Sequence, residues 1–200
     1  QFNNANNAQA KSMEKLSSGQ RINSASDDAA GLAISEKMRG QIRGLDQASR
    51  NAQDGVSLIQ TAEGALNETH DILQRMRELV VQAGNGTNKT EDLDAIQDEI
   101  GSLIEEIGGE DGSKGISDRS QFNGRNLLDG TLNVTLQIGA NAGQQVNLTI
   151  GDMSAEALSV NSIDVTDFST TTFDEQLATI DGAINQVSEQ RSGLGATQNR

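Results

Sequence analysis

One seven-residue repeat constrains the fold of this chain more than any other feature. No proline occurs between Leu32 and Ala83, and every seventh residue from Met38 onward is apolar. The members of this repeat are Met38, Leu45, Ala52, Ile59, Leu66, Leu73 and Val80. On an α-helix such spacing forms a continuous stripe along one side. At about 1.5 Å per residue the helix would be about 75 Å long, so the repeat predicts a rod that packs along other helices.

The composition fits a narrow bundle of helices and disfavours several functions. Of 200 residues, 34% are hydrophobic but only 2% are aromatic, which argues against a bulky compact core. A net charge of −14 disfavours nucleic acid and anionic membrane surfaces as partners, because both attract basic proteins. No apolar run approaches the ~20 residues that span a bilayer. The absence of cysteine rules out disulfides and thiol chemistry.

Two further helices are predicted. Gly84 to Asn88 is a stop-and-turn sequence, after which a second helix over 90–107 begins at Thr90. Its apolar residues are spaced three and four apart: Leu93, Ile96, Ile100, Leu103 and Ile107. A short turn between two helices makes them antiparallel neighbours. The same period returns from Phe173, with the apolar residues Phe173, Leu177, Ile180, Ile184, Val187 and Leu194.

Between these helices the apolar period changes from helical to alternating. Gly108 to Gly130 is an extended connector, which Phe122, Leu127 and Leu128 should anchor on the helices. Alternating apolar residues then predict a β-hairpin over 131–151 with a loop from Gly139 to Gln145. Because a lone hairpin is only marginally stable, its apolar face should cover the helices. Residues 151–172 are expected to be loop with short turns.

The expected fold is therefore mainly α. It is an elongated rod of three long helices, two N-terminal and antiparallel and one C-terminal, with a β-hairpin packed on it. Residues 1–18 are polar and are expected to be either helix that lacks its partner or a frayed end. Residues 19–28 are expected to be an ordered connector, in which Ser26, Asp27 and Asp28 can cap the long helix over 32–83. The pairs Asp46–Arg50 and Asp71–Arg75 should stabilise that helix, because acidic and basic side chains four residues apart attract each other.

Several stretches of the chain resemble bacterial flagellins, and most closely those of Bacillus-like Firmicutes. The resemblance is carried by residues 16–34 (LSSGQRINSASDDAAGLAI), 60–66 (QTAEGAL), 73–79 (LQRMREL), 121–124 (QFNG) and 190–200 (QRSGLGATQNR). It covers nearly the whole chain.

The resemblance implies an extracellular, motility-related filament subunit, secreted through the flagellar type III pathway. It implies as partners other copies of the chain and, for the full-length protein, the export machinery and its chaperones. It also implies a domain organisation: 1–18 as a remnant of the terminal D0 region, 19–168 as the N-terminal part of the D1 domain, and 169–200 as the truncated C-terminal D1 helix. On this reading the chain is a fragment.

Flagellins of this type are similar to those recognised by Toll-like receptor 5, an innate immune receptor. The family's receptor-binding motif matches Arg75, Leu79 and Glu99, and the flanking candidates are Gln74, Glu78, Gln82 and Ile96. Arg75 and Leu79 lie four residues apart, outside the heptad register, so both are expected to be exposed. Glu99 would lie beside Ile100 on the antiparallel second helix.

Two other functions were weighed against a filament subunit. Within the family, a hook–filament junction protein is possible, but the length of the matching signature argues against it. The signalling hairpin of a chemoreceptor is also rich in Ala, Gln and Glu, but it would need a long uninterrupted second helix. No nucleophile, metal cluster or phosphate loop stands out, so we expect no enzyme, no catalytic residue, no metal site and no cofactor. The single histidine, His70, is expected on a helix surface.

Overall fold

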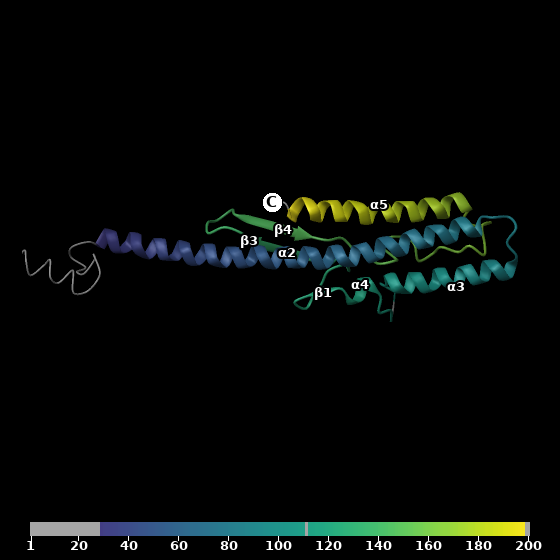
Figure 1. The fold of residues 1–200 in the computed structure, drawn as a ribbon, viewed down its shortest axis with the longest axis horizontal. Helices are drawn as coiled ribbons and strands as arrows, with labels where there is room; N and C mark the ends of the chain where they lie inside the picture. The colour runs from purple at the N-terminus through teal and green to yellow at the C-terminus, as the bar shows by residue number, and fades with distance from the viewer. Residues whose placement is uncertain (1–28, 111, 199–200) are drawn as a thin grey trace, which may run out of the picture. The chain divides into compact units, whose positions relative to one another are not determined.

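A computed structural model describes residues 29–110 and 112–198, and it is mainly α as predicted (Figure 1). The expectations for residues 1–18 and 19–28 lie outside the described residues. The elements are α2 (Ala29–Ala83), α3 (Thr90–Ile107), α4 (Ile116–Arg119), β1 (Gln121–Phe122), β2 (Arg125–Asn126), β3 (Asn133–Gln137), β4 (Gln145–Thr149) and α5 (Phe173–Gln198).

The described chain divides into two compact units. The boundary crosses α2 after Arg50 and crosses the hairpin after Gln137 and before Gln145. The larger unit therefore contains the C-terminal part of α2, α3 to β4 and α5, while the smaller unit contains the N-terminal part of α2 and the tip of the hairpin.

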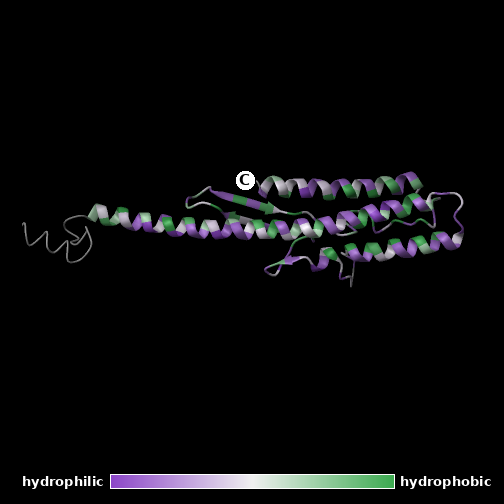
Figure 2. Cartoon of the chain, in the orientation of Figure 1, coloured by the Kyte–Doolittle hydropathy of each residue, from purple (hydrophilic) through white to green (hydrophobic). Residues whose placement is uncertain are grey.

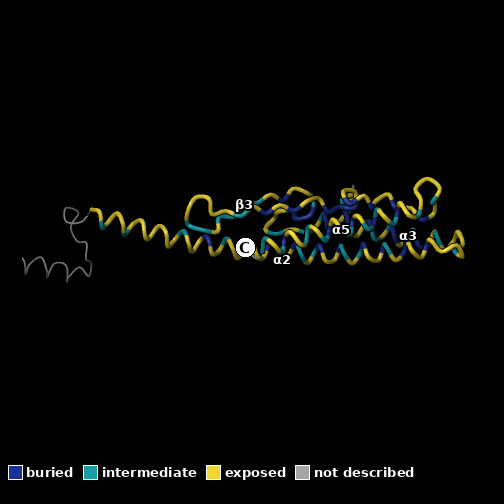
Figure 3. The backbone as a smooth tube through the Cα atoms, turned by 90° about the horizontal axis from the view of Figure 1, so that it is seen from above, coloured by how far each residue is buried: buried dark blue, intermediate teal, exposed yellow. Residues whose placement is uncertain are grey.

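The second half of the heptad stripe forms the spine of the larger unit. Ile59, Leu66, Leu73 and Val80 are at most 3% exposed. Positions between them are buried as well: Ala62, Thr69, Met76 and Ala83. Residues that step by three and four cover a broader sector than one heptad register, so α2 can pack against more than one neighbour. Figure 3 shows the buried positions gathered where α2 lies beside α3 and α5.

Two ion pairs mark the flanks of α2 in this unit. Arg75 reaches Glu99 of α3, and Arg77 donates to Asp181 of α5 at 2.8 Å. At about 100° per residue, Arg75 and Arg77 lie on opposite sides of the buried sector. Helix α2 therefore lies between α3 on one side and α5 on the other. Both partner helices also bury the faces expected from their sequences, Ile96, Ile100 and Ile107 in α3 and Ile180, Val187 and Leu194 in α5.

The first half of the heptad stripe is not buried, which contradicts the prediction of one continuous packed seam. Met38 is 57% and Leu45 56% exposed, and Leu32, Ile34 and Ile42 are similarly open. Figure 2 shows hydrophobic and hydrophilic positions alternating along the N-terminal part of α2. Among the described residues of the smaller unit, the hairpin tip approaches the helix where Ala140 lies against Gly44, and Ala48 is buried. The helical period thus predicted the helix correctly, but it did not reveal how far along α2 other elements pack.

The β-hairpin is confirmed, with an antiparallel register that pairs Val134 with Leu148 and Leu136 with Val146. Leu132, Leu148 and Ile150 are buried in the common core, as is expected for a hairpin that covers helices. A Cβ atom built on Gly55 of α2 would lie only 2.6 Å from the Leu136 Cδ1 atom. The missing side chain at this glycine therefore lets the hairpin lie directly on α2.

The connector over 108–130 contains more structure than the sequence predicted. Leu127 and Leu128 are buried and Phe122 packs against the core, as expected. However, β1 and β2 form a second small hairpin, whose turn consists of Asn123 with φ 51° and Gly124 with φ 79°. An Asn-Gly pair is a strong hairpin signal, because both residues tolerate positive φ, so this element could have been predicted.

The loop over 151–172 contributes to the core, although it contains no long element. Its buried apolar residues are Met153, Ala155, Leu158, Val160, Ile163 and Val165. Two glutamines hold it: Gln97 of α3 accepts from the backbone N–H of Val165, and Gln176 of α5 accepts from that of Asp164, each at 2.8 Å. The loop thereby connects α3 with α5.

Candidate functional site

The turn between α2 and α3 brings together three of the residues predicted for the site. Helix α2 ends before Gly84, whose N–H donates to the Val80 carbonyl oxygen at 3.0 Å. At the start of α3, the Lys89 N–H donates to the Asp92 side chain at 2.9 Å. The antiparallel return then places Glu99 beside Arg75. The Arg75 Nε and Nη2 atoms both donate to Glu99 Oε1, at 3.0 and 2.9 Å. Arg75 Nη1 donates to Glu78 Oε2 at 3.2 Å.

This cluster is open to solvent. The side chains of Arg75, Glu99 and Glu78 are 47%, 45% and 69% exposed. The hydrogen bond to Glu99 is the main cause that raises the pKa of Arg75 above its ordinary value, and the hydrogen bond to Glu78 is the next largest. Exposed pairs of this kind add little to stability, so the cluster orients the guanidinium more than it stabilises the fold. A fixed cation between two carboxylates offers a partner both charged donors and acceptors.

The two ion pairs predicted from spacing within α2 do not form. Arg75 binds Glu99 and Glu78 rather than Asp71, and Arg50 donates to Gln47 at 3.0 Å rather than binding Asp46. For Arg75 the physical reason is geometric: one carboxylate oxygen on α3 accepts two of its N–H groups at once.

Leu79 and Ile96 are buried, so the expectation of an exposed leucine beside Arg75 is wrong. Leu79 is 1% and Ile96 6% exposed. At about 100° per residue Leu79 lies between Arg75, which reaches α3, and Met76, which is buried. It therefore lies on the flank of α2 that α3 covers. The expectation considered the heptad register alone, whereas α2 is covered on two sides.

The remaining candidates lie on the exposed side of α2. Gln74, Glu78 and Gln82 are all exposed, and the Gln82 carbonyl accepts from the Asn88 side chain at 2.6 Å. Gln74 Nε2 lies 3.5 Å from His70 Nε2. His70 is half-buried rather than fully on the surface, and its Nδ1 is enclosed without a hydrogen-bond partner among the described residues.

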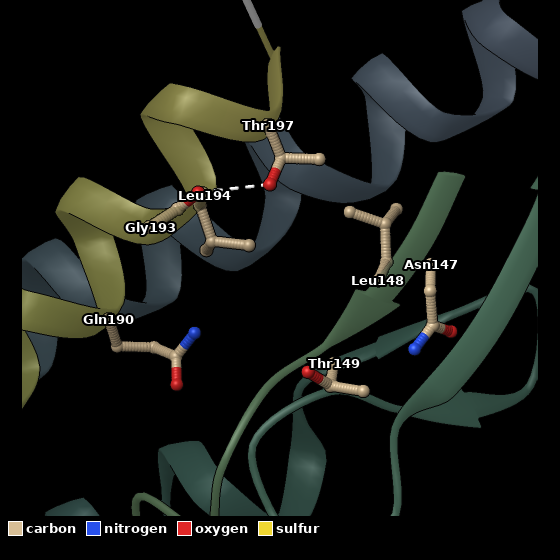
Figure 4. A pocket seen from close by; sticks show the side chains of 7 residues that line it. All are labelled: Asn147, Leu148, Thr149, Gln190, Gly193, Leu194 and Thr197. Carbon is tan, nitrogen blue, oxygen red and sulfur yellow. Dashed lines mark hydrogen bonds between the residues drawn. The ribbon is translucent and has the colours of Figure 1, made fainter. Parts of the chain in front are cut away.

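A groove also lies between β4 and α5 (Figure 4). Its lining residues are Asn147, Leu148, Thr149, Gln190, Gly193, Leu194 and Thr197. Two of its polar side chains already have partners within the chain, since Gln190 Oε1 accepts from the Gly151 N–H at 3.1 Å and Thr197 donates to the Gly193 carbonyl at 3.0 Å. The groove brings together no acid–base pair or nucleophile, so it is a seam between hairpin and helix.

The described residues contain neither a candidate metal site nor a candidate membrane-spanning helix. Across residues 29–110 and 112–198, no group of histidine and acidic side chains is arranged to hold a metal ion. None of the helices in the same ranges has the length and apolar character needed to cross a membrane.

Comparison with known proteins gives consistent matches. Residues 1–133 match the family described as the bacterial flagellin N-terminal helical region. The chain is 58% identical to a flagellin of Bacillus subtilis, over 98% of this chain and 73% of that protein. It is 57% identical to a flagellin of Halalkalibacterium halodurans, over 95% of this chain and 68% of that protein.

Among solved structures, the chain resembles the crystal structure of Bacillus cereus flagellin. The TM-score is 0.64 at 31% sequence identity, over 76% of this chain and 84% of the other. The chain therefore shares its fold with a solved flagellin over about three quarters of its length.

Proposed function

This chain belongs to the bacterial flagellins, and from that premise we propose that Toll-like receptor 5 binds the exposed face of α2 and α3 centred on Arg75 and Glu99. As a flagellin it is a structural, non-enzymatic subunit of the extracellular flagellar filament, into which flagellins self-assemble. Membership of the flagellin family argues against the chemoreceptor and junction-protein alternatives. The proposal adds to this family membership that the chain is recognised by the receptor.

The observation that carries the proposal is the fixed and open position of the Arg75 guanidinium. Its contacts with Glu99 and Glu78 hold it in place across two helices while almost half of its side chain remains exposed. An oriented arginine loses less conformational freedom on binding, and arginines are enriched among the residues that dominate protein interfaces. Gln74 and Gln82 extend the same open face and can supply amide donors and acceptors.

The buried candidates have a different role in this proposal. Leu79 and Ile96 lie beneath the face and position α2 against α3, so they influence binding through the spacing of Arg75 and Glu99 rather than by contact. Truncating Leu79 to alanine is therefore expected to destabilise the fold by about 2–5 kcal/mol, as for other buried leucines. Loss of binding in that variant would not identify a contact.

The test is a binding titration with the receptor ectodomain and the variant Arg75→Ala. We expect affinity to fall at least about tenfold, since central interface arginines often cost more than 1.4 kcal/mol on truncation. Helix content measured by circular dichroism should stay unchanged, because the lost ion pairs are exposed.

The matched control is Arg77→Ala. Arg77 is on the same helix, two residues away, and also makes an interhelical ion pair, but it pairs with Asp181 on the opposite flank. Its removal should leave receptor affinity within about twofold of the parent chain. Equal affinities for the parent, Arg75→Ala and Arg77→Ala chains would refute the proposed face, and equal losses in both variants would point to a nonspecific charge effect instead.

A further inference from the structure

Helix α3 carries a line of unpaired carboxylates on its solvent side. The helix has seven acidic residues and no basic one, and three of the acids have internal partners: Asp92 caps the helix, Glu99 binds Arg75 and Glu106 binds Arg119. The others are exposed and make no side-chain hydrogen bond or ion pair with the described residues: Glu91, Asp94, Asp98 and Glu105. At about 100° per residue, Asp94, Asp98 and Glu105 fall within about 40° of one another, turned away from the buried isoleucines.

The N-terminal part of α2 carries a line of arginines with the same spacing. Arg39, Arg43 and Arg50 are four and seven residues apart, as are Asp94, Asp98 and Glu105. All three arginines are exposed. Arg39 has only a loose 3.4 Å contact with Glu36, Arg50 donates to Gln47, and Arg43 makes no ion pair with any described residue. This stretch is basic in an otherwise acidic chain.

The arginine line does not coincide with the exposed apolar stripe of the same segment. Met38, Ile42 and Leu45 are centred about 120° around the helix from the arginines. One neighbour can therefore cover the apolar stripe while another contacts the arginines. The two surfaces need separate explanations.

We propose that the carboxylate line (Asp94, Asp98, Glu105) of one subunit binds the arginine line (Arg39, Arg43, Arg50) of a second copy of the chain. The ends of each line are eleven residue steps apart, or about 16 Å of helix. In a parallel alignment all three pairs match. In an antiparallel alignment Arg39 faces Glu105, Arg50 faces Asp94, and Arg43 lies within one helical turn of Asp98.

A second copy is the favoured partner, because one self-assembling chain carries both the carboxylate line and the arginine line. Two different complementary patches on one molecule make a head-to-tail contact, which extends into a filament when the rotation between copies does not close a ring. Complementary charge steers such encounters and fixes their register, while the many other acidic side chains repel wrong alignments. The proposal adds a specific contact to the family's known self-assembly and is independent of receptor binding.

The experiment uses the complete flagellin and measures the critical concentration for growth on filament seeds at low ionic strength. One variant carries R39E, R43E and R50E, and the other carries D94K, D98K and E105K. Each alone should raise the critical concentration about tenfold or more, because attraction becomes repulsion in three positions. An equimolar mixture of the two should assemble close to the unmodified protein, since each variant's altered line then meets its complement. High salt should reduce the assembly defect of each triple variant tested alone, because the charges are exposed.

Two controls reverse equally exposed charges outside the lines. Lys37→Glu lies on the other side of α2 from the arginines, and Glu156→Lys lies in the loop before α5. Both should assemble normally. Milder variants, Arg43→Gln and Asp98→Asn, give a double-mutant cycle if a triple variant loses helix content. Normal assembly of both triple variants, no rescue in the mixture, or additive effects in the cycle would each overturn the proposal.

Discussion

At the scale of single residues, one carboxyl oxygen of Asp118 accepts three hydrogen bonds. Its Oδ2 atom accepts from the N–H of Gly109 at 2.9 Å, the N–H of Gly115 at 3.2 Å and the hydroxyl of Ser113. Burial alone would raise the pKa of Asp118, but the bonds from Ser113, Gly109 and Gly115 outweigh it and lower that pKa. One carboxylate thus organises the loop between α3 and α4.

We predict that Asp118→Asn destabilises the chain by about 1–2 kcal/mol at pH 7, because charge-assisted bonds become neutral ones. A carboxyl group whose pKa is lowered in the folded state stabilises that state above its unfolded pKa, and this contribution is lost as the pH falls through the folded pKa. The difference in unfolding free energy between parent and variant should therefore shrink below about pH 4.

Urea unfolding followed by circular dichroism at several pH values measures this difference. The matched control is Glu156→Gln, an exposed carboxylate without a side-chain partner among the described residues. It should leave the unfolding free energy almost unchanged at every pH. A gap between Asp118→Asn and the parent that stays constant down to pH 3 would show that the hydrogen bonds matter but the charge does not.

The sequence predicted which residues could form the site but not all of their surroundings. Arg75, Glu78 and Glu99 form one exposed cluster, and Gln74 and Gln82 are exposed on α2. The burial of Leu79 was not predicted, because it depends on which flank of α2 the next helix covers, and spacing within one helix carries no such information. For the same reason spacing within α2 predicts Asp71 as an ion-pair partner of Arg75, whereas Arg75 binds Glu78 and, on α3, Glu99.

At the scale of elements, the loop before α5 depends on two side-chain amides. Gln97 accepts from the Val165 N–H at 2.8 Å and donates to the Ile163 carbonyl at 3.0 Å. Gln176, only 2% exposed, accepts from the Asp164 N–H and donates to the Asp164 carbonyl, both at 2.8 Å. Each glutamine thus supplies this extended segment with the backbone hydrogen bonds that a neighbouring strand would otherwise provide.

We predict that Gln97→Met and Gln176→Met each cost about 1–3 kcal/mol, because methionine fills the space but leaves buried backbone groups without partners. Their combined effect should differ from the sum, since both hold the same short segment. Denaturant midpoints provide the measurement, and Gln53→Met, an exposed position on α2, is the control. Strict additivity, or a cost equal to that of the control, would mean that the loop is held by its apolar residues alone.

This loop also shows what periodicity cannot predict. The three helices and the β-hairpin follow from regular spacing, and the small hairpin at Asn123 could have been found from its Asn-Gly turn. The segment over 151–172 has no period, because its buried residues are placed by irregular turns and by Gln97 and Gln176, distant in sequence. Only the folded arrangement shows that it belongs to the core.

At the scale of the whole molecule, stability should be unevenly distributed along α2. The helix is continuous from Ala29 to Ala83, yet its buried apolar residues are concentrated after Arg50. An isolated helix is marginal in water, and packing supplies most of the stability of helices in proteins. The 29–50 segment should therefore open locally at much lower free energy than the 58–83 segment.

Hydrogen exchange followed by mass spectrometry, on chains kept dilute enough to be monomeric, tests this expectation. We predict that amides of 30–50 exchange orders of magnitude faster than those of 58–83, which should open only on global unfolding. Paired substitutions sharpen the test: Met38→Ala should change the unfolding free energy by less than about 0.5 kcal/mol, whereas Leu66→Ala should cost about 2–5 kcal/mol. Equal protection along the whole helix would show that the exposed stripe from Ile34 to Leu45 is covered in the monomer. Protection that appears only as filaments grow would instead show that assembly completes the seam that the heptad repeat encodes.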